Sequence, residues 1–222
     1  MKEILPIDVQ LKHPFTMMVV GPTMCGKTEW VSKLIEHKAS LIYPPPVRVV
    51  WSYKTWQSAY YRLSNIHNVT FIQGMEINFT ENKTPTLLII DDQMSDVNDK
   101  VVDWFTRGCH HDNISLIFIA QNLFFPDKKF RTASLNCHYL QIFKNPRDNY
   151  QIRHLARQMF PGKRSKLMID AFEDATTQNY GYLLVDLKPS TPDSLRLRTN
   201  ILPTEGFKMI GCNDGLTQCY GI

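Results

Sequence analysis

Short apolar runs alternate with amphipathic stretches along most of the chain. Unbroken apolar runs are typical of strands buried on both faces, and apolar positions three or four apart are typical of helices. Their alternation predicts an α/β fold, a mostly parallel central sheet flanked by helices. The predicted strands are 15–20, 47–51, 69–72, 87–90, 116–120, 139–143 and 182–185, with 195–201 as an edge strand. The predicted helices are 27–37, 56–63, 98–107, 147–159 and 163–175.

No internal repeat and no Gly/Ser-rich linker interrupts the 222 residues. We therefore expect a single domain over 1–222, with 1–13 as an N-terminal arm and about 206–222 as a C-terminal tail. No apolar run approaches the roughly 18 residues that cross a bilayer, and the first residues lack the apolar core of a secretory signal. Five scattered cysteines favour free thiols in a reducing compartment. The expected protein is neither secreted nor membrane-spanning.

The first chemical motif follows the strand predicted at 15–20 and matches the Walker A pattern G-x-x-x-x-G-K-[ST]. Its glycines let backbone amides turn inward around phosphate oxygens, and the helix that follows directs its positive end at the same anion. Lys27 would reach the β- and γ-phosphates and Thr28 would hold Mg²⁺. The expected cofactors are ATP and Mg²⁺. The loop consists of Gly21, Pro22, Thr23, Met24, Cys25, Gly26, Lys27 and Thr28.

A second motif has the form of a Walker B strand, four apolar residues followed by Asp91 and Asp92. Asp91 emerges at the carboxyl end of the strand, where open α/β sheets bind ligands, and would coordinate Mg²⁺ through water. Asp92 stands where many ATPases carry a glutamate that orients the attacking water. Gln121, after the strand at 116–120, is the candidate sensor of the γ-phosphate. The alternative interpretations are a helix cap for the acids and a strand-end hydrogen bond for Gln121.

The two motifs are far apart in the sequence, since 64 positions separate Lys27 from Asp91. This spacing leaves room for two strands, near Val47 and Val69, and predicts at least one extra strand between the loop strand and the acid strand in the sheet. Such an arrangement is typical of RecA-like motors and disfavours simple nucleoside kinases.

The net charge of +4 is small, but the charge is unevenly distributed. A basic window over 128–166 carries ten basic residues and one acid, so it is net +9 and the rest of the chain is net −5. Such polarisation favours a phosphate-rich partner on one side, although a solvated basic face is the simpler interpretation. The basic residues are Lys128, Lys129, Arg131, Lys144, Arg147, Arg153, Arg157, Lys163, Arg164 and Lys166.

The segments GPTMCGKT, LLIIDDQM and FTRGCHHDNISLIFIAQNLF, in this spacing, resemble the viral genome-packaging ATPases of the FtsK–HerA superfamily. Within it, the chain is most similar to the packaging ATPases of Polinton-like (adintovirus-type) elements, which are related to the poxvirus-type enzyme. The resemblance covers about 15–203 and includes NPRDNYQIRHLARQMFP and YGYLLVDL. It implies a RecA-like (ASCE) P-loop NTPase.

The resemblance also implies a function and partners. Such proteins form homo-oligomeric rings, here a pentamer or hexamer, that hydrolyse ATP to thread double-stranded DNA into a preformed capsid without reading its sequence. The implied location is the capsid vertex in an infected host cell, in the nucleus or at the viral assembly site, with transient presence on the virion. Lys128, Lys129 and the segment 163–166 would be pore residues.

In such rings an arginine of one subunit reaches the γ-phosphate of its neighbour. Arg107 is the first candidate, with Arg131 and Arg147 as alternatives, because His110 stands where some relatives carry arginine. His110 and His111 are interpreted as lining the subunit interface or the entrance for the DNA strand, rather than as zinc ligands with the cysteines, since their spacing fits no common zinc pattern. Two other functions stay open, a nucleoside or nucleotide kinase and a nucleotide-switched capsid assembly factor.

Overall fold

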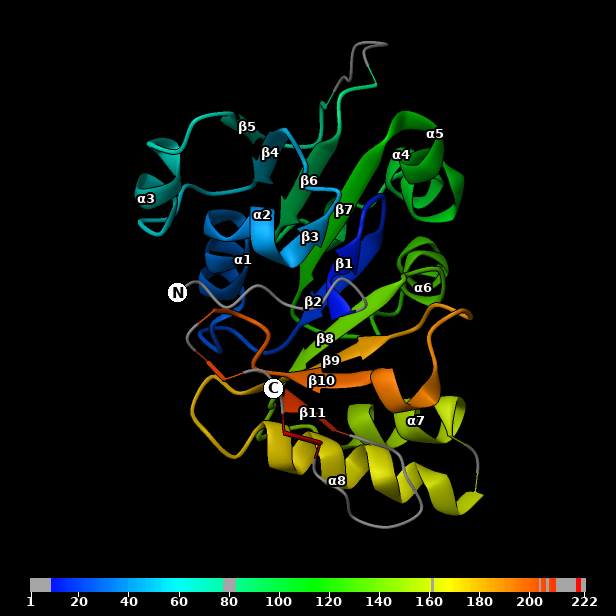
Figure 1. The fold of residues 1–222 in the computed structure, drawn as a ribbon. Coiled ribbons are helices and arrows are strands. Elements are labelled where there is room, and N and C mark those ends of the chain that lie inside the picture. Colours follow the sequence, from blue (N-terminus) through cyan, green and yellow to red (C-terminus); the bar gives the residue numbers. More distant parts are fainter. Residues whose placement is uncertain are drawn as a thin grey trace.

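The computed structural model of the chain describes residues 9–77, 83–160, 162–203, 205–206, 208–210 and 219–220. A ten-stranded sheet runs through the described part (Figure 1). Within those residues, no helix is long and apolar enough to cross a membrane. In spatial order the strands are β12 (Cys219–Tyr220), β11 (Lys208–Met209), β10 (Leu197–Thr199), β9 (Tyr182–Asp186), β8 (Tyr139–Phe143), β2 (Thr16–Val20), β7 (Ile114–Ala120), β6 (Thr86–Asp91), β4 (Arg48–Tyr53) and β5 (Val69–Gln73).

The strands from β8 to β5 are mutually parallel, and β9 to β12 continue the sheet in antiparallel fashion. The predicted α/β fold with a mostly parallel sheet is confirmed. An extra strand does lie between the loop strand β2 and the acid strand β6, but it is β7, which comes later in the chain. The strands near Val47 and Val69, β4 and β5, lie beyond β6 instead.

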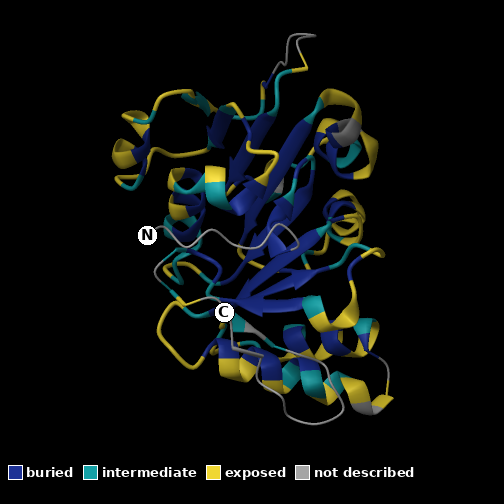
Figure 2. Cartoon of the chain, in the orientation of Figure 1, coloured by how far each residue is buried: buried dark blue, intermediate teal, exposed yellow. Residues whose placement is uncertain are grey.

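Helices cover both faces of the sheet because successive side chains of a strand point to opposite sides. Met17 and Val19 of β2 pack in one hydrophobic cluster and Met18 and Val20 in the other. The central strands β2, β6, β7, β8 and β9 are consequently buried on both faces, whereas the edge strand β5 is partly exposed (Figure 2). The first cluster contains α1 (Lys27–Glu36), α2 (Lys38–Leu41) and α3 (Tyr60–Ser64). The second contains α4 (Asp99–Asp103), the π-helical turn η3 (Trp104–Gly108), α5 (Cys109–Asp112), α6 (Lys128–Leu135), α7 (Tyr150–Met159) and α8 (Ser165–Ala175).

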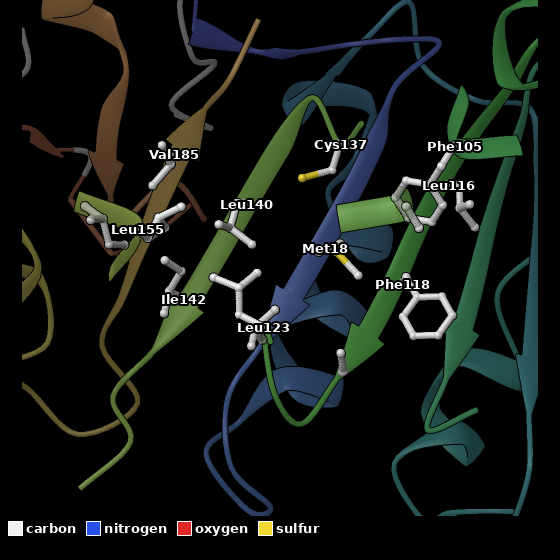
Figure 3. Packing of buried hydrophobic residues seen from close by; sticks show 14 of the residues in the cluster. Met18, Phe105, Leu116, Phe118, Leu123, Cys137, Leu140, Ile142, Leu155 and Val185 are labelled. Carbon is white, nitrogen blue, oxygen red and sulfur yellow. The ribbon is translucent and has the colours of Figure 1, made fainter. Parts of the chain in front are cut away.

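The second cluster contains the largest part of the core (Figure 3). Met18 lies close to Leu116 and Phe118 of β7. The ring centroids of Phe105 from η3 and Phe118 are 6.5 Å apart. On the other side of β2, strands β8 and β9 meet α7 and α8, which pack against each other (Figure 1). The parallel strands that carry the predicted motifs are thus fixed by packing along their whole length.

Several local predictions are wrong. Residues 56–59 precede the short helix α3 rather than belonging to it. The segment 98–107 is helical as predicted, but its second half is a π-helical turn. Helix α6 was not predicted; it begins after Asp127, whose carboxylate accepts a hydrogen bond from the Phe130 amide at 2.8 Å. The strand at 195–201 is not at an edge, because β10 pairs with both β9 and β11.

Parts of the predicted arm and tail pair with other strands. In the arm, β1 (Leu11–Lys12) pairs in parallel with β3 (Ile42–Tyr43), and Leu11 is buried. In the tail, β11 and β12 extend the sheet. The expected arm residues 1–8 and most of the tail lie outside the described residues.

A buried ion pair joins the antiparallel strands to the start of the described chain. Arg198 Nη2 lies 2.8 Å from Asp186 Oδ2, both side chains are buried, and Arg198 Nη1 donates to the carbonyl of Val9 at 2.9 Å. Removing one member of such a pair leaves an uncompensated buried charge.

We expect Asp186→Ala to lower the free energy of unfolding by about 3 to 5 kcal/mol, because the Arg198 guanidinium then stays buried without its counter-ion. Urea denaturation measures this loss. The matched control is Asp193→Ala, which removes a 59% exposed carboxylate from the partly buried Arg196. It should cost at most about 1 kcal/mol, because Arg196 keeps its hydrogen bonds to the carbonyls of Asp186 and Lys188. Equal effects of the two substitutions would contradict the prediction.

Candidate active site

The Walker A segment connects the end of β2 to the start of α1, and both of its glycines are needed there. A β-carbon at Gly21 would lie 2.7 Å from Cys25 Sγ and from Phe143 Cβ, so no larger residue fits. Gly26 caps α1 with φ 99°, in the left-handed region that favours glycine. The loop therefore has the tight backbone that a phosphate cradle requires.

The Lys27 side chain folds back toward the start of this loop. Its Nζ donates to the carbonyls of Gly21 at 2.6 Å and Pro22 at 2.8 Å. Burial lowers the pKa of the ammonium, opposed by the charges of Cys25, Asp91 and Asp92. An ammonium that is partly desolvated among backbone carbonyls is poised to exchange them for phosphate oxygens, which carry full negative charge.

The structure brings the two motifs together at the carboxyl end of the parallel strands. Thr28 Oγ1 donates to Asp91 Oδ2 at 3.4 Å, although 63 positions separate the residues. A loop threonine beside a strand-end aspartate is the pair that holds Mg²⁺ in P-loop NTPases. The donor set, one hydroxyl and one carboxylate, is the hard oxygen chemistry that Mg²⁺ prefers.

Asp91 is 2% exposed, and its carboxyl group is strongly affected by this burial. Burial raises the pKa of Asp91 to about 6, with a further rise from the charge of Asp92. The hydrogen bond from Tyr60, the Lys27 charge and the Thr28 hydroxyl lower it in part. A carboxylate that is costly to bury alone would be stabilised by a bound cation.

Asp92 and Gln121 also meet, as the end of β6 and the end of β7 lie near each other. Gln121 Nε2 donates to Asp92 Oδ1 at 3.0 Å. The chain turns at Asp92, which adopts φ 55°, and its side chain is exposed. The amide and the carboxylate are thus linked at the solvent side of the Thr28–Asp91 pair, within reach of a water molecule that approaches from outside.

Tyr60 is a site residue that sequence reasoning missed. Its hydroxyl donates to Asp91 Oδ2 at 2.7 Å, and its ring lies in an aromatic cluster with Trp51 and Phe71. A helix over 56–63 was predicted, but its residue pattern contained no sign that Tyr60 would reach an acid 31 positions later. Gln93, which donates to Ser52 Oγ at 2.6 Å, similarly fixes the backbone after the acids.

The predicted arginine finger does not belong to this cluster. Arg107 lies on η3, which leads to the start of β7, whereas Gln121 follows its end. Its side chain is 76% exposed and pairs with Asp103 on the same helical segment. Of the alternatives, Arg131 is exposed on α6, and Arg147 is exposed in the loop that follows β8.

Burial disfavours the thiolate form of the cysteines that the structure describes beside the site and in the core. Burial raises the pKa of the Cys25 thiol, opposed by Lys27, so the thiolate needed for reactivity is disfavoured. Burial also raises the pKa of Cys137 to about 12. Among the described residues no group of three or more His, Cys, Asp or Glu side chains could hold a metal ion, and the His110 side chain lies outside that description.

The fold matches solved structures of viral and bacterial ATPases. Genome-packaging NTPase B204 from Sulfolobus turreted icosahedral virus 2, in complex with ATP-γS, superimposes with TM-score 0.53 at 14% identity over 80% of this chain and 94% of B204. Its sulfate complex gives TM-score 0.50 at 18% identity over 81% and 94%. EssC ATPases 2 and 3 from Geobacillus thermodenitrificans give TM-score 0.54 at 10% identity over 91% of this chain and 41% of EssC.

No protein-family profile matches the sequence, and no curated protein matches it. At these identities the structural likeness shows the fold alone. It confirms the predicted α/β fold of ASCE P-loop proteins, in which helices flank a mostly parallel sheet, and the NTPase B204 and the EssC ATPases share that fold with this chain. One strand does lie between β2 and β6, as predicted, but it is β7 rather than a strand from the segment between the two motifs.

We expect the wild-type protein in EDTA to lose stability relative to Asp91→Asn as the pH rises from about 4 to 7. The native carboxyl has a pKa of about 6 and the unfolded one about 4, so between these values the native state binds more protons and stability falls. The relative loss between pH 4.5 and pH 7.5 is about 2 kcal/mol, because two pKa units separate the states and part of the loss has already occurred at pH 4.5. Urea denaturation at pH 4.5 and pH 7.5 measures it; a pH-independent difference would refute the assignment.

Proposed function

We propose that the protein is an ATPase that drives double-stranded DNA into a viral capsid. The observation that carries the ATPase part is the Thr28–Asp91 contact, which joins the two phosphate-site motifs at the edge of the sheet where ligands bind. The structural likeness to a packaging NTPase supports the coupling to DNA.

Each residue of the cluster has a proposed role. The backbone amides of 21–28 and the Lys27 ammonium bind the triphosphate, and Thr28 and Asp91 would hold Mg²⁺, which supplies charge neutralisation when bound. Asp92 orients the attacking water, and the amide of Gln121, hydrogen-bonded to Asp92, responds to the γ-phosphate. Tyr60 fixes the Asp91 carboxylate by its hydroxyl, so that this oxygen keeps one orientation.

An exposed arginine completes the site in the proposed ring of five or six copies. Its planar charge would offset the negative charge that develops at the neighbour's γ-phosphate. Arg107 fits the requirement of exposure, and Arg147 has the additional property of lying after the carboxyl end of β8, on the edge that carries the nucleotide site.

The basic window lies on one side of the molecule. Its described side chains are all exposed, and they are carried mainly by α6, α7 and the segment that leads into α8, which cover the same face of the sheet. Phosphate contacts from lysine and arginine without base readout suit a motor that grips any sequence. We therefore assign this face to DNA.

One hydrogen bond links α7 on this face to the segment that follows Gln121. Two residues after Gln121, the Leu123 amide donates to Gln151 Oε1 of α7 at 3.1 Å. The same helix carries Arg153 and Arg157, which line an open depression of about 700 Å³ together with Asn122 and Phe124. A change at Gln121 on hydrolysis would be passed to the basic helix through this connection.

The two alternative functions predict different behaviour. The strand order disfavours a simple nucleoside kinase, in which the loop strand neighbours the acid strand. A nucleotide-switched assembly factor predicts ATP-dependent oligomerisation with almost no turnover. The capsid vertex as partner and the infected host cell as location rest on the sequence resemblance and on the likeness to B204.

We expect Lys27→Ala to lower ATP turnover by about a hundredfold or more, because the triphosphate loses its cationic partner. Phosphate release measures turnover, and circular dichroism checks the fold. The matched control is Lys33→Ala, an exposed lysine on the same helix α1, which should keep wild-type turnover. Unchanged turnover in Lys27→Ala would refute the proposed mechanism.

We expect duplex DNA to stimulate the ATPase and to bind with a strong salt dependence, whereas a kinase would be indifferent. Replacing both Arg153 and Arg157 by alanine should reduce the slope of log affinity against log salt by about two, since each phosphate contact releases about one counter-ion. Fluorescence anisotropy measures binding. The control double substitution, Lys33→Ala with Lys38→Ala on the opposite face, should leave the slope unchanged; equal slopes in both would contradict the DNA assignment.

A further inference from the structure

Tyr180 lies against the phosphate-binding loop, although it comes from the distant connection between α8 and β9. A β-carbon at Gly26 would be 3.2 Å from Tyr180 Cδ1 and 3.7 Å from its Cβ and Cγ, so the tyrosine packs directly on the last glycine of the loop. The residue is nonetheless 71% exposed. An aromatic side chain that touches the loop on one side and solvent on the rest is available for a ligand.

The position of Tyr180 is imposed by its neighbours. It adopts φ 63°, which bulky side chains rarely do, in a turn closed by the Gly181 amide on the Gln178 carbonyl at 3.0 Å. A β-carbon at Gly181 would lie 2.5 Å from the Ala175 carbonyl oxygen, so the turn is fixed to the end of α8. The next residue, Tyr182, is buried against Trp30 of α1. Unusual backbone conformations that the surroundings hold in place gather at functional sites.

The geometry of the loop indicates which part of a nucleotide would reach Tyr180. The acids and Gln121 follow β6 and β7, on one side of β2, and mark the γ-phosphate end. On the other side of β2, Gly21 contacts Phe143 of β8, whose neighbour β9 begins just after Tyr180. A triphosphate with its γ end at the acids therefore directs its nucleoside away from them, toward the side where Tyr180 lies.

We propose that Tyr180 stacks on the nucleobase of the bound nucleoside triphosphate. This inference rests on the proposed nucleotide site and adds the residue that distinguishes a nucleotide from a bare polyphosphate. Stacking requires only a π-face, so every base is accepted, and the larger purines are favoured over pyrimidines. The ring does not contact the phosphates, which are bound by the loop and Lys27.

The test compares Tyr180→Ala with Tyr180→Phe, which keeps the aromatic ring, using calorimetric titration with ATP, CTP and inorganic tripolyphosphate. We expect Tyr180→Ala to weaken ATP binding by about tenfold and CTP binding by less, with tripolyphosphate binding unchanged. Tyr180→Phe should bind ATP like wild type. Equal weakening of ATP and tripolyphosphate, or no weakening of ATP, would overturn the proposal, since Tyr180 would then only support the loop or play no part.

The same titrations separate this inference from the proposed function. Wild-type protein that binds ATP and tripolyphosphate equally well overturns the stacking role and leaves the phosphate cradle intact. Wild-type protein that binds neither overturns both. Lys27→Ala should lose both ligands, a pattern that differs from that of Tyr180→Ala. Thermal unfolding of each variant confirms that an exposed substitution at position 180 has not disturbed the fold.

Discussion

The hydrogen bond between Thr28 and Asp91 is the interaction on which the proposed site depends. It exists because two parallel strands, separated by one other strand, end at the same edge of the sheet and are buried on both faces. Neither residue could be placed by local structure alone. The packing of β2, β7 and β6 fixes the distance between the glycine loop and the acids. Tyr60 contacts the Thr28–Asp91 pair directly, and Gln121 contacts the neighbouring Asp92.

The same burial sets a cost. A carboxylate enclosed by β4, β6 and α3 is partly desolvated, and its pKa of about 6 records that cost. The hydrogen bond from Tyr60 offsets part of the desolvation cost, but the ionised carboxylate is still less favourable here than in solvent. Functional sites commonly give up some stability of the folded protein in order to hold a side chain, here the Asp91 carboxylate, in place before anything binds.

Most of the parallel sheet could be predicted from sequence, because β2, β6 and β7 contain continuous apolar runs that end at Gly21, Asp91 and Gln121. The Walker residues could be predicted because their spacing is fixed by the shape of a phosphate. Strand direction could not, since the pattern of β9 does not differ from that of a parallel strand. Helix α6 has only Phe130 and Ala133 buried, too few for a periodic signal, and the Asp127 cap was overlooked. Tyr60 and Tyr180 reach the site through long-range contacts that no local pattern encodes.

The guanidinium of Arg198 has a consequence for the order of assembly. It donates hydrogen bonds both to the Val9 carbonyl and to Asp186. Arg198 and Val9, which are 189 positions apart, therefore meet in one buried contact. A chain emerging from the ribosome can form β2 to β7 early, but the first described residues find this anchor only after nearly the whole sheet has been synthesised. Contacts of such sequence separation slow folding, because the loop-closure entropy is lost before any contact compensates it. The contact between Val9 and Arg198 therefore forms only after position 198 has been synthesised, whereas Leu11 can already pair with Ile42 of β3.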